Sequence, residues 1–419
     1  MTSRQLAIGN SHLAYKTLLS TEDPDNIYLD ILITNVGSYT TSPPPIIFNE
    51  ARQSPYINNP QEYEMSIIRF QCDTSTLPVI VPLVKPNQAD PNLTVYSISM
   101  QYQIDAAHPI VQVSVPVIFE PQDLSQPVPA GPSSNPNGLQ TISPYYYYYN
   151  YQSFIYIIFK AFQACFNALD LAVSGYLTAN NVIAPTLNWD TTTNTATIFC
   201  ESPWYNTTIK DPTTHVISTN PYNIRVYFNT PLYYLFNSFV FVGHGDSAPN
   251  NQNYELIVGS FGINTVYVPP TLTPSTGAVP CNVLYQEYST VSLWTPVTSL
   301  VFTTTLLPVI PTQLTRPLLF NDNAVIDSLN GTNANFINQI TDISLYGDQY
   351  VPSVIYNPTA QYRFISLNGS QPLNQIDILV YWKTRFGTFI PLTLESGGTC
   401  SLKIYFRKKR YLTQDKDNN

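Results

Sequence analysis

Residues able to act as acids, bases or metal ligands are few in this sequence, and histidine is the scarcest of them. The four histidines are His12, His108, His215 and His244. None of them has the spacing of an HExxH motif or of two ligands on one helix face. His244 and Asp246 are the strongest candidates for a metal or catalytic site, because both side chains can lie on one side of an extended loop. Their neighbours Gly243 and Gly245 are more typical of a surface turn, which is the interpretation we favour.

Other enzyme signatures are missing from the sequence. It contains no GxSxG nucleophile elbow, no P-loop and no GxGxxG motif. Glycoside hydrolysis needs two carboxylates at a set distance, and nothing among the 27 acidic residues singles out such a pair. Four tryptophans do not indicate a sugar-stacking cleft. The sequence therefore predicts a protein that is not an enzyme and that uses no metal or cofactor.

The cysteines give no sign of catalytic or metal chemistry either. They are Cys72, Cys165, Cys200, Cys281 and Cys400. Their number is odd, they lie far apart, and no pair has the CxxC spacing of a redox or zinc motif. We expect buried free thiols in a reducing compartment. The first 15 residues have no apolar core of the kind that a signal peptide needs.

A run of five tyrosines invites a binding role. Tyrosine offers a large contact area with a polar tip and loses few rotamers on immobilisation, so it is favoured at interfaces. We expect about half of these rings to pack in the core, since a following helix can cover them. The others are candidates for contacts between subunits. The five residues are Tyr145, Tyr146, Tyr147, Tyr148 and Tyr149.

Charge is scarce and unevenly distributed. The net charge is −9, yet the segment from Lys383 to Arg410 holds seven basic residues and one acidic residue, Glu395. A positive face of this kind can meet polyphosphate or an anionic membrane. It can equally be a basic sheet edge that discourages edge-to-edge pairing, and the sequence leaves both interpretations open. The candidate cluster is Lys403, Arg407, Lys408, Lys409 and Arg410.

The elements that must position these residues are mainly β-strands. Charged residues make up 11% of the chain and hydrophobic residues 44%, which excludes a disordered chain and a coiled coil. Period-two alternation dominates the first third and predicts strands at 27–34, 63–70, 94–102 and 110–119. Pro109 and Pro116 place the last of these at an edge or a bulge.

The middle of the chain differs in kind. A segment rich in Pro, Gly, Ser and Asn, 121–144, predicts a linker or long loop. Apolar residues at steps of three and four then predict an amphipathic helix over 154–169. Four polar residues interrupt the apolar window 154–173, which argues against a membrane span. A β-hairpin is expected at 186–199, and a short helix capped by Thr230 with Pro231 at its first position.

The strand pattern then resumes and continues to the end. We expect strands at 297–306, 339–346, 362–367, 376–383, 389–394 and 401–407. The sequence thus predicts an all-β fold, a single jelly-roll sandwich of about eight antiparallel strands with a large α+β insertion domain. The expected parts are an N-terminal arm (1–25), the first half of the jelly roll (26–120), the insertion (121–290), the second half (291–410) and a polar tail (411–419).

Several of these stretches resemble the minor capsid (penton) proteins of polinton-like viruses, virophages and Polinton elements. The resemblance covers most of residues 60 to 410 and rests on strand patterns with scattered anchors. In the front part it is carried by 63–70 (YEMSIIRF), 77–82 (LPVIVP) and 94–99 (TVYSIS). In the middle it is carried by the tyrosine run, the 154–169 helix and 232–236 (LYYLF). The closest likeness is at 362–367 (YRFISL), 376–382 (IDILVYW) and 403–409 (KIYFRKK).

The resemblance implies a structural virion protein whose homopentamers occupy the five-fold vertices of an icosahedral capsid. It implies trimers of a major capsid protein as neighbours, and assembly inside the host cell. The basic cluster would then face the capsid interior, a neighbouring capsomer, the genome or an internal membrane. The insertion domain would project outward and could meet a host receptor.

Two other roles remain open on the sequence. About 400 residues can hold two jelly rolls, as in a trimeric major capsid protein, although the helix-bearing insertion argues against it. An adhesin or receptor-binding β protein would need a compact pocket and a secretion route, and the sequence shows neither.

Overall fold

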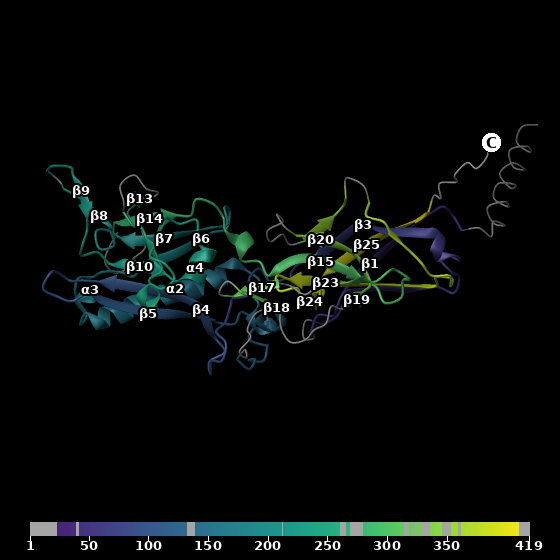
Figure 1. The fold of residues 1–419 in the computed structure, drawn as a ribbon, viewed down its shortest axis with the longest axis horizontal. Helices are drawn as coiled ribbons and strands as arrows, with labels where there is room; N and C mark the ends of the chain where they lie inside the picture. The colour runs from purple at the N-terminus through teal and green to yellow at the C-terminus, as the bar shows by residue number, and fades with distance from the viewer. Residues whose placement is uncertain are drawn as a thin grey trace, which may run out of the picture. The chain divides into compact units, whose positions relative to one another are not determined.

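The computed structural model describes residues 23–38, 42–131, 139–211, 213–259, 265–268, 280–313, 318–321, 324–327, 336–345, 353–358 and 362–409. Contacts within the chain define two units. Unit 1 comprises residues 1–76, 299–383 and 389–419, and unit 2 comprises residues 77–298 and 384–388. Unit 2 therefore interrupts unit 1 in the sequence, and the strands and helices of each can be followed in Figure 1.

The main part of unit 1 is two antiparallel sheets. Two short pairs also belong to it, β16 (Thr312–Gln313) with β19 (Phe336–Ile337) and β17 (Leu318–Asn321) with β18 (Ala324–Asp327). The strand order is β1-β25-β3-β21 in one sheet, with β22 also paired to β3, and β2-β23-β15-β20 in the other, with β24 also paired to β23. The strands are β1 (Asn26–Thr34), β2 (Ile47–Ala51), β3 (Tyr63–Asp73), β15 (Val297–Thr303), β20 (Gln339–Ser344), β21 (Ser353–Tyr356), β22 (Ile365–Ser366), β23 (Gln375–Thr384), β24 (Phe389–Pro391) and β25 (Thr399–Lys408).

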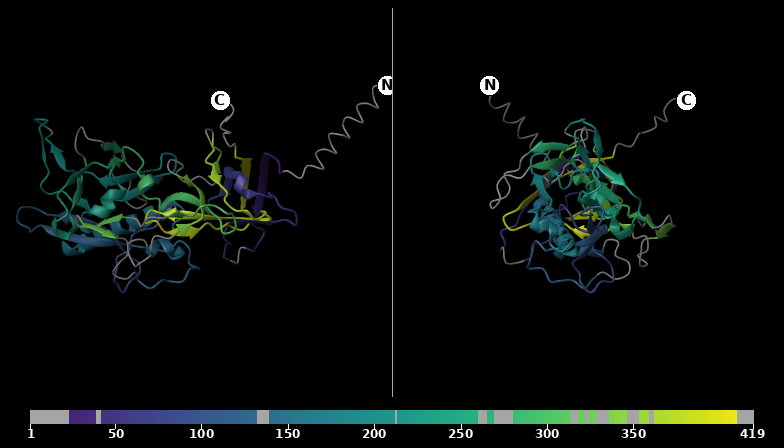
Figure 2. Two further views of the ribbon diagram at one scale, coloured as in Figure 1. Left: turned by 45° about the vertical axis from the view of Figure 1, so that its right-hand side comes forward. Right: turned by 90° about the vertical axis from the view of Figure 1, so that its left-hand side faces the viewer.

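The strand order of unit 1 is that of a jelly roll. When its eight main strands are numbered along the chain, one sheet reads 1-8-3-6 and the other 2-7-4-5, so the chain crosses repeatedly between the sheets. The first and last of these strands, β1 in purple and β25 in yellow, pair along their full length (Figure 2). Unit 2 lies in the sequence between the third strand, β3, and the fourth, β15.

Alternating apolar residues hold the two sheets of unit 1 together. The predicted inward faces are confirmed in β23 and β25, where every second side chain is buried. Phe70 on β3 meets Phe302 on β15 edge to face, with ring centroids 4.8 Å apart. Both rings are completely buried, so this contact joins the two sheets through the middle of the sandwich. The buried residues of β23 and β25 are Ile376, Ile378, Val380, Trp382, Leu402, Ile404 and Phe406.

A buried carboxylate fastens the segment after β15 to β23. Asp377 accepts hydrogen bonds from the hydroxyls of Thr304 and Thr305, both at 2.6 Å, and from the amides of Thr305 and Leu306, both at 2.8 Å. Burial raises the pKa of this carboxyl, but the hydrogen bonds outweigh burial and leave the pKa below its usual range. A charged side chain is therefore stable here, because its oxygens are fully occupied by donors.

The described part of unit 2 contains two larger sheets, a two-stranded sheet of β8 and β9, and the long helix. One sheet has the order β11-β12-β10-β4-β5 and the other β13-β14-β7-β6. The strands are β4 (Leu93–Tyr102), β5 (Val111–Ile118), β6 (Thr186–Asp190), β7 (Thr195–Glu201), β8 (Thr208–Lys210), β9 (Ile217–Thr219), β10 (Arg225–Phe228), β11 (Phe241–Gly243), β12 (Tyr254–Leu256), β13 (Thr265–Val268) and β14 (Cys281–Tyr285). The helices are α2 (Tyr151–Ala172), α3 (Tyr176–Ala179) and α4 (Thr230–Leu235).

Helix α2 forms the centre of unit 2. It begins at Asn150, whose side-chain oxygen accepts a hydrogen bond from the Ser153 amide at 2.8 Å. Its apolar side packs on both sheets, since Phe154 meets Tyr96 of β4 and Tyr151 meets Trp189 of β6. The predicted helix and its buried stripe are confirmed. The stripe comprises Phe154, Ile158, Phe162, Phe166 and Leu169.

The units divide the chain at other residues than we expected. The strands predicted at 94–102 and 110–119 exist as β4 and β5, but β4 pairs with β10 of unit 2, so both strands lie outside the sandwich. Their places in the jelly roll are taken by β2 and β21, two short strands that the sequence did not indicate. Strand pairing depends on contacts far apart in the sequence, which local periodicity does not report.

Smaller differences concern element ends. The cap of α4 is Asn229 rather than Thr230, because the Asn229 side chain accepts from the Leu232 amide. The strand expected at 362–367 is reduced to Ile365–Ser366 with an isolated bridge at Leu367, and the one expected at 389–394 to Phe389–Pro391 with an isolated bridge at Thr393. The expected arm, up to residue 22, and the polar tail lie outside the described residues.

Candidate interaction surfaces

The tyrosine run packs inside unit 2. Four of its rings are buried, and three of them surround Phe119 with centroids between 5.2 and 5.5 Å away. Each of the four hydroxyls has a partner, so the polar tips are satisfied without water. Tyr145 donates to Asn92 Oδ1 (2.8 Å), Tyr146 to the Pro91 carbonyl (3.0 Å), Tyr147 to the Thr141 carbonyl (2.6 Å) and Tyr148 to the Glu120 carbonyl (2.8 Å).

More of the run is buried than the half that we expected, because four of the five rings pack inside the unit. Burial raises the pKa of Tyr146 to about 12 and raises those of Tyr147 and Tyr148 further. Rings held in this way contribute to the core of unit 2 and expose too little surface to reach another subunit, and the same holds for Tyr145. Tyr149 is half-buried and stays a prediction as an intersubunit contact.

The predicted basic cluster is less positive than its composition suggests. Arg407 on β25 donates from Nε to Glu64 Oε1 at 2.8 Å, and Lys408 Nζ lies 3.6 Å from Glu62 Oε2. Lys409 donates to two backbone carbonyls, those of Gln61 and Leu367. Arg407, Lys408 and Lys409 therefore all have partners within the chain. Arg410 lies outside the described residues.

Aromatic side chains share the outer side of the β1–β25–β3 sheet with these cations. Tyr28 of β1 and Tyr405 of β25 stack with centroids 4.6 Å apart and planes 5° from parallel. Tyr362 and Phe364, from the segment leading into β22, meet Tyr405 edge-on at 6.2 and 5.7 Å. Leu32 lies four residues after Tyr28 on the same side of β1 and is 68% exposed. We call these five residues the aromatic face.

Cations lie over two rings of the aromatic face, and two of the nearby cations, Arg407 and Arg69, are paired with the acids Glu64 and Asp30. The Arg407 guanidinium lies 3.8 Å from the Phe364 ring centroid, and Lys403 Nζ lies 5.7 Å from that of Tyr28. Arg69 forms a bidentate pair with Asp30 at 2.8 and 2.7 Å.

The composition of this face is that of a protein interface. Tyrosine, phenylalanine and arginine are enriched in the centres of such interfaces. An ion pair that already exists can be covered by another protein without burying an unpaired charge. Polyphosphate, in contrast, is attracted by cations that have no acidic partner. The aromatic face was not predicted from the sequence, although Tyr28 and Tyr405 lie at outward positions of two correctly predicted strands.

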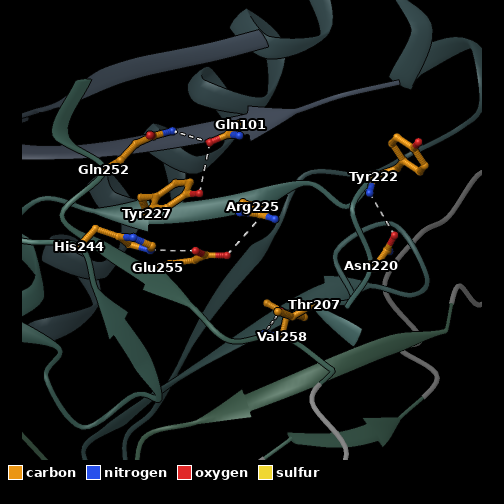
Figure 3. Close-up of polar contacts among 10 residues, drawn as sticks. All are labelled: Gln101, Thr207, Asn220, Tyr222, Arg225, Tyr227, His244, Gln252, Glu255 and Val258. Carbon is orange, nitrogen blue, oxygen red and sulfur yellow. Dashed lines mark hydrogen bonds and ion pairs between the residues drawn. The ribbon is translucent and has the colours of Figure 1, made fainter. Parts of the chain in front are cut away.

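His244 and Asp246 have different partners and do not form a common site. Figure 3 shows His244 beside Glu255. His244 Nε2 lies 2.9 Å from Glu255 Oε2, whereas Asp246 Oδ1 accepts a hydrogen bond from the Thr230 hydroxyl at 2.6 Å. Glu255 is buried, and Arg225 Nε lies 3.8 Å from its other oxygen. Within the described ranges, no group of three or more His, Cys, Asp or Glu side chains could hold a metal ion.

The surrounding polar contacts fasten the loop between β11 and β12 (Figure 3). Tyr227 and Gln252 both donate to Gln101 Oε1, at 3.3 and 3.1 Å. Burial and the nearby Glu255 raise the pKa of Tyr227 to about 12, against the lowering effect of Arg225. The Ser99 hydroxyl donates to the Asn250 carbonyl at 2.6 Å. Residues of β4 and β12 thus hold the loop, which is a structural role.

Helix α2 has the length and composition of a membrane-spanning helix, with 56% of its most apolar window buried. The sequence analysis argued against a span because of its polar residues. In the structure its apolar side packs on the sheets of unit 2, as a core helix does.

Comparison with known proteins gives consistent matches over nearly the whole chain. A family model described as Sputnik minor capsid protein V18/19 matches residues 27–408. Protein V18 of Sputnik virophage, which is uncharacterised, is 32% identical over 158 residues, covering 36% of this chain and 89% of V18. Structural protein V19 of Sputnik virophage is 26% identical over 231 residues, covering 54% of this chain and 97% of V19.

Two solved structures share the fold. A chain of the Sputnik virophage structure determined by cryo-EM has a TM-score of 0.74 and 25% identity, and the match covers 93% of this chain and all of the other. The mavirus penton protein has a TM-score of 0.56 and 16% identity, and the match covers 92% of this chain and all of the penton protein.

Proposed function

Because this chain belongs to the Sputnik minor capsid protein V18/19 family and is a structural protein of the virion rather than an enzyme, we propose that it forms homopentamers at the five-fold vertices of an icosahedral capsid. The observation that supports this most is its likeness in fold to the mavirus penton protein over 92% of the chain. Its neighbours in the shell would be trimers of a major capsid protein.

The aromatic face supplies one half of the contact between subunits. A ring of five requires two different patches that meet head to tail and close after five rotations. The stacked pair of Tyr28 and Tyr405, with Leu32 beside it, offers a flat apolar area with paired charges around it. Covering these side chains removes apolar surface from water at roughly 25 cal/mol per Å².

Two further roles are part of this proposal. The cations of β25 face a neighbouring capsomer or the capsid interior, where the genome or an internal membrane would be their partner. Unit 2 projects outward and carries the surface that a host receptor would meet.

The mass of the protein in solution tests the pentamer. We expect five copies of the 47.1 kDa chain by native mass spectrometry, and loss of the pentamer in the double variant Tyr28→Ser with Tyr405→Ser. Tyr288→Ser is the matched control, because Tyr288 is 57% exposed in unit 2 and lies outside the aromatic face. Three copies would instead favour the face-forming trimer. If the chain is monomeric alone, a particle map whose vertex density fits another protein would refute the vertex role.

A further inference from the structure

Two cysteines that are far apart in the sequence are direct neighbours in unit 1. Cys72 is the penultimate residue of β3, Cys400 is the second residue of β25, and the two are opposite each other in the antiparallel register. Residues in such a pair point to the same side of the sheet, with Cβ atoms about 4.5–5.5 Å apart. A disulfide needs about 3.5–4.5 Å between Cβ atoms, so a small movement of one strand end suffices.

The two thiols are buried at directly opposite positions of paired strands. Cys72 Sγ donates a hydrogen bond to the Asp73 carbonyl at 3.2 Å. Both cysteines are 1% exposed, in a row across the sheet that runs Ile33, Cys400, Cys72, Val354. The residues on either side of the two cysteines in this row, Ile33 and Val354, are both apolar.

We propose that Cys72 and Cys400 are a disulfide-forming site that closes when the protein moves from a reducing to an oxidising environment. The oxidant is a disulfide of the glutathione class. One cysteine thiolate attacks it, giving a mixed disulfide and one glutathione thiolate, and the second cysteine thiolate then displaces the other glutathione. Two protein thiols lose two protons and two electrons, and one glutathione disulfide becomes two glutathione thiols.

Access to the pair is through the end of the sheet. The hydrogen bond to Cys72 and burial both raise the pKa of the Cys400 thiol, so little thiolate is present while the strands are closed. The cysteines lie one residue from the ends of β3 and β25, where strands open most readily. Oxidation is therefore slow in the folded protein and proceeds through local opening.

The chain contains its own control pair. Cys200 on β7 is opposite Asn282 of β14, and Cys281 is opposite Glu201. Because successive residues alternate between the two sides of a strand, Cys200 and Cys281 point to opposite sides of their sheet. Both are as deeply buried as Cys72 and Cys400. Burial is thus matched between the two pairs, whereas the register and the side of the sheet differ.

The test is oxidation of the folded, full-length protein in a glutathione redox buffer, followed by alkylation of the remaining thiols and peptide mass mapping. We expect the free thiols to fall from five to three, with one cross-linked peptide joining Cys72 to Cys400 and with Cys165, Cys200 and Cys281 alkylated. Cys165→Ser should oxidise in the same way with four thiols falling to two, whereas Cys400→Ser should keep all of its four.

The oxidised protein should also unfold at a higher urea concentration than the reduced one, and dithiothreitol should reverse the difference. Five alkylated cysteines, glutathione adducts alone, or a link between any other two cysteines would overturn the proposal. Mapping of the unmodified chain decides this even if a serine variant fails to fold. The result does not depend on the oligomeric state, so it stands apart from the pentamer.

Discussion

Tyr28 and Tyr405 stack almost parallel across β1 and β25, the first and last strands of the jelly roll, with ring centroids 4.6 Å apart. Tyr28 is 55% exposed, so the pair stabilises the sheet while presenting a ring to the outside. Since Tyr405 also meets Tyr362 and Phe364, it is the centre of the aromatic face.

The stack predicts a modest coupling inside the isolated subunit. Aromatic pairs contribute about 0.5–1.5 kcal/mol beyond their burial, so a double-mutant cycle of Tyr28→Ala and Tyr405→Ala should show a coupling of about 1 kcal/mol in urea unfolding. The same cycle with Tyr288→Ala in place of Tyr28→Ala should give none. Strict additivity of the Tyr28 and Tyr405 effects would show that the stack does not form in solution.

Asp377 should make unit 1 sensitive to acid. Its folded pKa lies below the usual range, so its contribution to stability is complete above the unfolded pKa and is lost as the pH falls through the folded value. Asp377→Asn should lower the free energy of unfolding by about 2 kcal/mol at pH 7. The difference between this variant and the parent should shrink towards pH 2.

Asp190→Asn is the control for Asp377, because Asp190 accepts hydrogen bonds from Thr192 and Thr193 in an exposed turn. We expect a clearly smaller effect there. If both variants lost the same free energy of unfolding, burial of Asp377 would make no additional contribution to stability.

Asn229 should matter more than the neighbouring Thr230. The Asn229 side chain accepts hydrogen bonds from the Leu232 and Ser97 amides, at 3.3 and 3.1 Å, and donates to the Val95 carbonyl at 2.8 Å. It therefore caps α4 and ties it to β4. Asn229→Ala should cost about 2 kcal/mol in chemical denaturation. Thr230→Ala removes only an exposed contact to Asp246 and should cost less; the reverse order would restore Thr230 as the cap.

Removal of the basic cluster should weaken incorporation into particles. Replacing Lys403, Arg407, Lys408, Lys409 and Arg410 by Ser deletes both the charge and several contacts within the chain. A milder variant, Lys403→Ser, leaves those contacts in place. We expect both variants to reduce the amount of protein in purified particles, with the five-fold variant lower. Undiminished incorporation of the five-fold variant at equal expression would reject a role for the cluster.

Strands and the long helix could be predicted where local periodicity is strong. β1, β3, β23, β25 and α2 were found at nearly their full length because each buries one regular stripe. β2 was missed, since it is short and follows three prolines. The assignment of β4 and β5 to the sandwich was wrong, because their alternation is equally suited to either unit and only pairing with β10 decides it.

The interaction surfaces were harder to predict than the fold. The basic residues of β25 were identified by composition, but their acidic partners, such as Glu62 and Glu64, come from β3 and the turn before it. The tyrosine run was noticed as unusual, yet its position against Phe119 follows from tertiary packing alone. Composition reveals which side chains are present, whereas neutralisation and burial depend on neighbours that are remote in the sequence.

Because β25 lies between β1 and β3, its sheet cannot be completed until the end of the chain has been synthesised. Both neighbours leave the ribosome long before β25 is synthesised, so the edges that β25 will pair with stay unpaired during that time. Most of unit 2, residues 77–298, is also synthesised before β25. The sandwich closes last. Tyr405 is part of that last strand, so a prematurely terminated chain lacks its stack with Tyr28. Under the proposed role of the aromatic face, such a chain would also lack that contact with its neighbours.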